Sequence, residues 1–286
     1  MALTKRKLKD KVHTKVGRKI IKKIVSFAEK NNPNLWGQNK WKKFVKDNVY
    51  LTLYKDLTRI GSIKLSNETR AWYTPTAKRL HHNYQEMRRV LSLWSDSQVE
   101  LGGPDDWNKA RDPSSFYKKF KKINLWMDSV DFALTGRRKV SKRSLGLSYK
   151  LDKPGRWFMV LMDGKSRIRT CFGPYSPKLY DGTWIENNKK WLETNLEGGY
   201  VAADTHFGSA RKLQGVIFFV PYSKAEKIYK SKEKYSVQLR KIRSLVESPF
   251  GLIKTKFEPL SKPFPEGAEQ LGYLVNYSIG IFNFEK

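Results

Sequence analysis

Hydrophobic residues recur at helical spacing through the first hundred positions of the chain. Isoleucine, valine and alanine fall three to four residues apart between positions 20 and 28, with lysine and arginine between them. The sequence Asn31-Asn32-Pro33 predicts a break after this helix. Apolar residues at the same spacing over 41–53 and over about 76–94 predict two more helices, and Gly102-Gly103-Pro104 ends the block.

From residue 123 the pattern changes to short apolar runs separated by turn residues. Such runs are typical of strands, and they lie at 123–127, 157–162, 167–172, 200–203 and 216–220. A helical pattern follows from about 233 to 246, next to Pro249. Strands followed by helices predict an α/β fold. We therefore expect a basic helical region over residues 1–120 and an α/β domain over residues 121–286.

The chain is strongly basic, with 57 Lys and Arg against 27 Asp and Glu in 286 residues and a formal net charge of +30. Such a charge repels itself in a compact protein and favours a polyanionic partner, of which nucleic acid is the commonest. Aromatic residues make up 13% of the chain, too many for a disordered basic tail, so a buried core is expected. The single cysteine, Cys171, excludes a disulfide framework and a cysteine-ligated zinc site.

The role of the basic N-terminal helices stays open between two interpretations. Short basic helices joined by a turn are typical of DNA-binding elements, but a solvated charged extension explains the same pattern, and no helix-turn-helix signature decides between them. Three tryptophans in polar surroundings are candidates for stacking on bases, although tryptophan is more often a core residue: Trp36, Trp41 and Trp184. No apolar run approaches the roughly 20 residues that cross a bilayer, so no membrane partner is expected.

Acidic residues stand out at the ends of the predicted elements because the rest of the chain is so basic. Asp128 follows the run at 123–127, Asp204 follows the run at 200–203, and Glu247 follows the helical pattern. Three carboxylates from separate elements are suited to holding two divalent metal ions, and magnesium prefers such oxygen ligands. Residue chemistry alone does not single out these three, since other acids are comparable candidates: Asp131, Asp163 and Asp181.

Four stretches of the chain carry a resemblance to a known family. They are Met127–Phe132 with Gly136-Arg137-Arg138-Lys139, then 157–182, then Ala203-Asp204-Thr205-His206-Phe207, and finally 243–257. In this order they resemble the catalytic blocks of DDE-superfamily transposases of the Harbinger/PIF type. The last stretch is the most specific, because it is similar to the family's R-x-x-V-E-x-x-F-G-x-L-K-x-R-F helix. The resemblance covers about residues 123–284.

The resemblance implies an RNase H-like mixed sheet flanked by helices, with a metal-dependent site. Asp128, Asp204 and Glu247 take the catalytic and metal-ligand positions, for Mg²⁺ or Mn²⁺. Asp128 is expected at the end of the first strand, although Asp-Ser-Val replaces the family's Asp-Gly-Thr and leaves Asp131 as an alternative first acid. The expected supporting residues are Arg243, Asp181 and His206. The expected contacts to the DNA backbone are Arg137, Arg138, Lys139, Lys142, Arg143, Lys254 and Lys256.

The implied activity is cleavage of DNA phosphodiesters, with joining of the released 3′ hydroxyl to a target as a further step. The implied partners are double-stranded DNA and either a second copy of the chain or a separate DNA-binding subunit, in the nucleus. A first alternative is a DNA-binding protein that descends from such an enzyme and has no nuclease activity. A second alternative is a basic structural protein that associates with RNA and needs no acid cluster.

Overall fold

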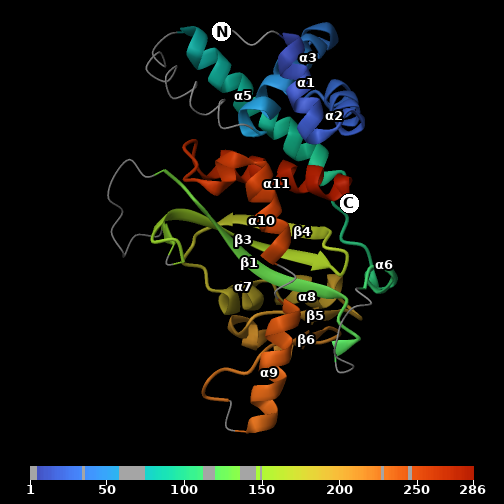
Figure 1. The fold of residues 1–286 in the computed structure, drawn as a ribbon, viewed down its shortest axis with the longest axis vertical. Coiled ribbons are helices and arrows are strands. Elements are labelled where there is room, and N and C mark those ends of the chain that lie inside the picture. Colours follow the sequence, from blue (N-terminus) through green and yellow to red (C-terminus); the bar gives the residue numbers. More distant parts are fainter. Residues whose placement is uncertain are drawn as a thin grey trace. The chain divides into compact units, whose positions relative to one another are not determined.

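The structure is a computed structural model that describes residues 5–33, 36–57, 75–111, 120–135, 146–148, 150–226, 229–243 and 247–286. The chain forms two compact units, and each is described by itself (Figure 1). The first unit combines residues 1–99 with residues 253–286, and the second comprises residues 100–252. The compact units therefore divide the chain differently from the predicted boundary at residue 120, because the C-terminal segment belongs with the N-terminal helices.

The first unit is helical in its described residues. Its helices are α1 (Lys5–Val16), α2 (Arg18–Lys30), α3 (Gln38–Leu57), α5 (Pro75–Asp96), the short η5 (Glu258–Ser261) and α11 (Ala268–Glu285). Three of them match the predicted patterns, and α2 buries its isoleucines while its lysines face solvent. In the described part of the chain, no helix combines the length and apolar character needed to cross a membrane.

Two of the three candidate stacking tryptophans are core residues instead. Trp41 is fully buried, and its Nε1 donates to the carbonyl oxygen of Ala28 at 2.6 Å, which fixes the start of α3 against the end of α2. Trp184 is 1% exposed, in the core of the second unit. The polar residues beside them in the sequence lie on the opposite sides of their helices, so the local composition was misleading.

Helix α11 crosses α5 at very short range inside the first unit. A Cβ atom on Gly280 would lie 2.5 Å from Oγ and 2.8 Å from Cβ of Ser95, so glycine is needed at this crossing. Ser95 Oγ also donates to the carbonyl oxygen of Asn276 at 2.7 Å. The hydrophobic pattern did not predict α11, because the helix is apolar along most of its length rather than on one stripe.

A buried network of charges lies between α3, α5 and the segment before α11. Arg88 donates to both carboxylate oxygens of Asp56, at 2.9 and 2.6 Å, and also to Glu266. Glu266 accepts a second hydrogen bond from Lys55 at 2.6 Å, and Tyr277 donates its hydroxyl proton to Asp56. Burial alone would raise the pKa of Glu266, but the charges of Arg88 and Lys55 outweigh it and lower the pKa to about 2.

The second unit is built on a mixed sheet. Its strands are β1 (Leu125–Ala133), β2 (Leu147–Ser148), β3 (Lys153–Asp163), β4 (Ile168–Tyr175), β5 (Tyr200–Ala202) and β6 (Ile217–Phe219). Strand β3 pairs antiparallel with β1 on one edge and with β4 on the other, where the short β2 also pairs with its first residues. Beyond β1 come β5 and β6, both parallel. Three antiparallel strands are thus followed by two parallel ones.

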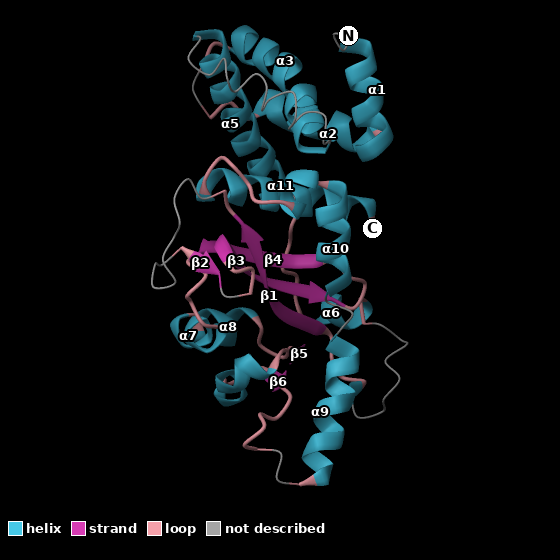
Figure 2. Cartoon of the chain, turned by 60° about the vertical axis from the view of Figure 1, so that its left-hand side comes forward, coloured by secondary structure: helices cyan, strands magenta, loops and turns pink. Residues whose placement is uncertain are grey.

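Helices cover both faces of this sheet (Figure 2). On one face, α7 (Asp181–Asn187) and α8 (Lys189–Asn195) bury Trp184, Ile185 and Leu192 against the strands. On the other face lie α9 (Lys230–Arg243) and the first turns of α10 (Glu247–Lys256). The short α6 (Pro104–Lys109) and η3 (Thr205–Lys212) complete the unit. The predicted α/β class, with a mixed sheet flanked by helices and a basic helical N-terminal region, is confirmed.

Two predicted element ends are wrong, and both concern predicted site residues. Strand β1 does not end at Met127 but continues to Ala133, because it pairs with β3 along its whole length, from Leu125 opposite Asp163 to Ala133 opposite Gly155. Asp128 therefore lies inside the strand. Glu247 does not end a helix but begins α10, whose first turn accommodates Pro249 because that position needs no backbone donor.

Candidate active site

The parallel pairing of β1 and β5 brings two of the predicted acids to neighbouring positions. Leu125 pairs with Val201 and Trp126 with Ala202, a constant offset along the two strands. The printed pairing ends at Trp126 and Ala202, and Asp128 and Asp204 each lie two residues beyond it. Asp204 directly precedes η3. Two acids that are far apart in the sequence thus follow the paired residues of two neighbouring strands by the same number of residues.

Both acids also point to the same side of the sheet. Their predecessors, Met127 and Ala203, are fully buried in the hydrophobic core under α7 and α8. Because successive side chains of an extended chain alternate between faces, Asp128 and Asp204 project to the opposite face. That face carries α9 and the start of α10 (Figure 2). Both carboxylates are half-buried, so they remain accessible from solvent.

The two carboxylates have the same local hydrogen-bond geometry. Asp128 Oδ1 accepts from the backbone N–H of Ser129 at 2.8 Å, and Asp204 Oδ1 accepts from the backbone N–H of Thr205 at 2.5 Å. Each contact limits the rotation of its side chain. Pre-oriented carboxylates lose less conformational entropy when they bind a cation.

The helix that begins with the third predicted acid lies over the same face of β1. Phe250 of α10 makes an edge-on ring contact with Phe132 of β1, with 6.3 Å between ring centroids. Phe132 shares its face with Asp128 because the two are four residues apart on one strand. Glu247 precedes Phe250 by three residues, one turn of the helix. Among the described side chains, which do not include that of Glu247, no group of three metal-ligating residues converges.

The alternative acids occupy different positions. Asp131 lies on β1 three residues after Asp128, so it faces the opposite side of the sheet, where it is 8% exposed. Asp163 is buried, and its carboxylate stabilises a turn. It accepts hydrogen bonds from the backbone N–H groups of Lys165 and Arg167 at 2.9 and 3.0 Å. Arg169 adds an ion pair to it at 2.8 Å. Asp163 therefore serves the β3–β4 connection.

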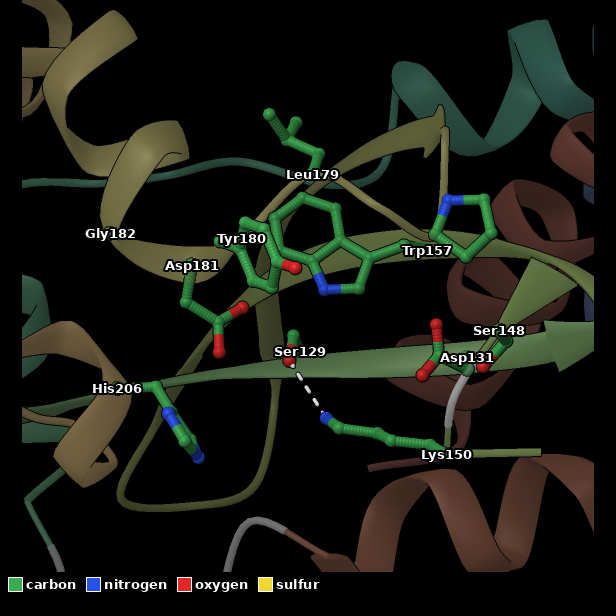
Figure 3. Close-up of a pocket in the computed structure, with 11 residues that line it drawn as sticks. Ser129, Asp131, Ser148, Lys150, Trp157, Leu179, Tyr180, Asp181, Gly182 and His206 are labelled. Carbon is green, nitrogen blue, oxygen red and sulfur yellow. Dashed lines mark hydrogen bonds between the residues drawn. The ribbon is translucent and has the colours of Figure 1, made fainter. Parts of the chain in front are cut away.

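Asp181, predicted as a supporting residue, lines a pocket together with Ser129, Lys150 and His206 (Figure 3). Burial raises the pKa of Asp181, against the nearby charge of Lys150 and a hydrogen bond with Ser129, which lower it. Asp204 and His206 are also close enough to influence this pKa. Lys150 Nζ donates to Ser129 Oγ at 3.2 Å. The sequence analysis did not single out Ser129 or Lys150, because an isolated serine or lysine carries no recognisable pattern.

The remaining predicted residues are placed as follows. His206 is exposed and lines the same pocket, and Arg243 is the last residue of α9. Lys254 is half-buried, and Lys256 forms an ion pair with Glu285, which neutralises its charge. The other predicted DNA contacts lie outside the described residues: Arg137, Arg138, Lys139, Lys142 and Arg143.

Comparison with known proteins identifies the class. Residues 127–283 match the family described as DDE superfamily endonuclease, and the chain belongs to that family. The match begins in β1 and ends in α11, so it includes the sheet and all three predicted acids. The mixed sheet and its covering helices are those of an RNase H-like DDE domain. No curated protein and no solved structure matches the chain.

Proposed function

We propose that this chain is a metal-dependent DNA nuclease of the transposase type, with Asp128, Asp204 and Glu247 as its catalytic carboxylates. One observation supports the proposal: β1 and β5 are parallel neighbours, and Asp128 and Asp204 each lie two residues beyond their last printed pair, Trp126 and Ala202. The match to the DDE superfamily endonuclease family supports a nuclease that acts on DNA and uses a divalent metal ion.

The donor set suits Mg²⁺ or Mn²⁺. Carboxylate oxygens are hard ligands, and two or three of them suffice because magnesium retains several waters. When bound, the metal ions activate a water for attack on phosphorus and stabilise the leaving oxygen. The chain itself orients the ligand oxygens. The backbone N–H groups of Ser129 and Thr205 donate to the carboxylates of Asp128 and Asp204 and limit their rotation. Asp181, His206 and Arg243 act as positioning residues around them.

Exposed lysines and arginines hold the DNA backbone in this proposal. In the described part of α2 and α3, exposed basic side chains alternate with the buried apolar ones: Arg18, Lys19, Lys22, Lys23, Lys30, Lys40, Lys42, Lys43 and Lys46. This arrangement favours a DNA-binding role for the N-terminal helices over a mere charged extension. The predicted basic stretch from Arg137 to Arg143 belongs to the same proposal. Backbone contacts of this kind give affinity without sequence information and weaken steeply with salt.

The proposal extends to joining, assembly and location. The 3′ hydroxyl released by cleavage attacks a target strand, either with a second copy of the chain or with a separate DNA-binding subunit that supplies recognition. The chain acts in the nucleus, and a fluorescent fusion tests that location. The Harbinger/PIF type rests on the sequence resemblance.

A cleavage assay on plasmid DNA with Mg²⁺ or Mn²⁺ tests the proposed carboxylates. We expect Asp128→Ala, Asp204→Ala and Glu247→Ala each to lower the rate at least a thousandfold, on the order of 4 kcal/mol of barrier, while DNA binding persists. Asp152→Asn changes an exposed acid at the β2–β3 turn and serves as the matched control. Asp131→Asn tests the alternative first acid, and we expect it to retain cleavage.

Full activity in any of the three alanine variants would remove that residue from the site. If the wild-type chain binds DNA in a salt-dependent way but does not cleave it with either metal, the inactive DNA-binding alternative is correct. Affinity that does not change with salt would count against a DNA partner altogether.

A further inference from the structure

The first three helices of the chain leave one side of α3 open to solvent. Helices α1, α2 and α3 pack against one another, and α3 is the longest of them, with 20 residues (Figure 1). Toward the end of α3, Tyr50 is half-buried against α1, where its ring makes an edge-on contact with His13, with 5.4 Å between ring centroids. Nearer the start of the helix, four side chains on the same side are exposed: Asn39, Lys42, Lys43 and Lys46.

The start of α3 is held in place by aromatic packing and by a hydrogen bond to α2. Trp41 Nε1 donates to the carbonyl oxygen of Ala28 at 2.6 Å. Trp36, the third candidate stacking tryptophan, is half-buried, and its ring packs edge-on against those of Trp41 and Phe44, with 5.8 and 5.2 Å between centroids. A helix fixed in this way presents its outer side chains in defined directions.

The four exposed side chains form one stripe along α3. Asn39 and Lys46 are seven residues apart, close to two full turns, so they point in nearly the same direction. Lys42 and Lys43 lie between them along the helix, one on each side of that line. The stripe thus has an amide and an ammonium group in its middle and a cation on either flank.

The charges of this stripe are not neutralised by the part of the chain that the structure describes. Residues 5–57 contain 16 Lys and Arg but only four Asp and Glu. Within the described residues, none of the four side chains takes part in an ion pair or a side-chain hydrogen bond, whereas Lys55 of the same helix is paired with Glu266 at 2.6 Å. Cations and an amide on one rigid helix favour a partner that offers phosphates together with hydrogen-bonding base edges.

The stripe matches the major groove of double-stranded DNA in size. An α-helix with its side chains is about 10–12 Å across, and the major groove is about 12 Å wide. Between Asn39 and Lys46 the helix rises about 10 Å, which spans about three base pairs. Duplex RNA does not fit in the same way, because its major groove is deep and too narrow for side chains to read.

We propose that the first half of α3 enters the major groove of double-stranded DNA and reads its sequence. Asn39 bonds the edge of an adenine and Lys46 that of a guanine, the pairings that these side chains favour, while Lys42 and Lys43 contact phosphates on either side. Sequence recognition then belongs to this chain and not to a separate DNA-binding subunit. The inference rests on the proposed function for the identity of its partner, DNA, but it concerns a surface in the other compact unit.

Selection from a random library of DNA duplexes tests the proposal. The full chain is mixed, without divalent metal so that no cleavage occurs, with duplexes of about 20 random base pairs, two turns of DNA, and the bound fraction is sequenced. We expect a motif of about three or more defined base pairs, bound about a hundredfold more tightly than an unselected duplex. Duplex RNA of the selected sequence should not compete at tenfold excess over the DNA, to about this order, because its groove excludes the helix.

Substitutions in the stripe separate reading of bases from contact with phosphates. Asn39→Ala should lower the preference for the selected duplex about tenfold and leave the affinity for unselected duplexes within about twofold. Lys42→Ala should weaken binding of both kinds of duplex by the same factor, about threefold, because a phosphate contact carries no sequence information. Both side chains are exposed on a helix, where alanine is well tolerated, so the fold should persist.

Asn195→Ala is the matched control. Asn195 is an exposed asparagine of α8 in the second unit, and its Nδ2 donates to the carbonyl oxygen of Trp191 at 2.9 Å. This variant should keep the sequence preference of the wild-type chain. A library that yields no motif, an Asn39→Ala variant that keeps the full preference, or RNA that competes as well as DNA overturns the inference.

The outcomes separate this inference from the proposed function. A chain that cleaves DNA with Mg²⁺ or Mn²⁺ but selects no sequence keeps the nuclease and loses the reading helix. A chain that selects a sequence through Asn39 but never cleaves keeps the reading helix and loses the nuclease.

Discussion

Two pairs of carboxylates, one pair in each compact unit, have different surroundings. In the first unit, Asp56 and Glu266 are buried, and cations of the same unit, Arg88 and Lys55, bind them. In the second unit, Asp128 and Asp204 are half-buried on the sheet, and each accepts the backbone N–H of the next residue. The first pair of acids sits inside a helical bundle, and the second pair sits at the junction of two parallel strands.

The difference separates structural acids from proposed functional ones. A carboxylate bound to a fixed guanidinium already has its counter-charge, and removing either partner leaves an uncompensated buried charge. The carboxylates of Asp128 and Asp204, in contrast, are half-buried, and each accepts a backbone N–H of its own strand or turn. Substitutions in the first unit should therefore reduce stability, and substitutions at the pair in the second unit should reduce metal response and cleavage.

The largest expected effect on stability comes from breaking the buried network. Arg88→Ala leaves Asp56 and Glu266 without their shared cation, and we expect a loss of about 3–5 kcal/mol of unfolding free energy in urea denaturation. The neighbouring Arg89 is the matched control, because it pairs with Glu86 at 3.5 Å and is 35% exposed. Arg89→Ala should cost about 1 kcal/mol or less. Equal losses in the two variants would contradict the structural role of the network.

Acid should weaken the same network. The pKa of Glu266 is lowered to about 2 in the folded chain, from an ordinary value of 4.5, so the unfolded chain binds more protons between these two values. The contribution of Glu266, roughly 3 kcal/mol, is complete above about pH 4.5 and is lost as the pH falls toward 2. The stability gap between wild type and Glu266→Gln should therefore close as the pH falls, and a gap that stays constant would show that the charge is not responsible.

The helix crossing in the first unit gives a smaller effect. Gly280→Ala places a methyl group 2.8 Å from Cβ of Ser95, so α5 and α11 must separate, at a cost of about 1–3 kcal/mol. Gly251 in α10 has nothing within 4 Å of the added carbon, and there alanine should stabilise by about 0.5–1 kcal/mol through helix propensity. Thermal unfolding of both variants measures the contrast. Stabilisation by both substitutions would mean that the crossing is looser than described.

The smallest effect on stability is expected at the proposed catalytic pair. Asp204→Asn removes one of two adjacent negative charges and should change the unfolding free energy by less than about 1 kcal/mol. Mg²⁺ should raise the melting temperature of the wild-type chain by mass action and leave that of Asp204→Asn nearly unchanged. A variant that responds to Mg²⁺ as strongly as wild type would place the metal elsewhere.

Much of the second unit follows from local sequence. The short apolar runs bounded by turn residues predict β3, β4 and β5 close to where they lie, and the resemblance to DDE transposases points to Asp128, Asp204 and Glu247. The ends of β1 and of the helix before Glu247 could not be predicted in the same way. Strand β1 is prolonged by its pairing with β3, and that pairing is a long-range contact.

The pocket that Asp181 lines could be predicted even less well from the sequence. Trp157, Lys150 and Tyr180 stand in a strand, a turn and a loop, and each has an ordinary local explanation. They become a site only because β1, β3 and the start of α7 meet at one place. The sequence carried a signal for Asp181, through the family segment, but none for the residues around it.

The sequence by itself determined the class of fold and the basic character that favours a polyanion, because these properties reside in residue composition and short periodic patterns. Tertiary structure decided which acids are partners. Asp56, Arg88 and Glu266 meet through helices from both ends of the chain, and Asp128 and Asp204 come from two strands that are parallel neighbours. A carboxylate looks the same in every sequence; whether a buried guanidinium neutralises it depends on distances that only the packed chain sets.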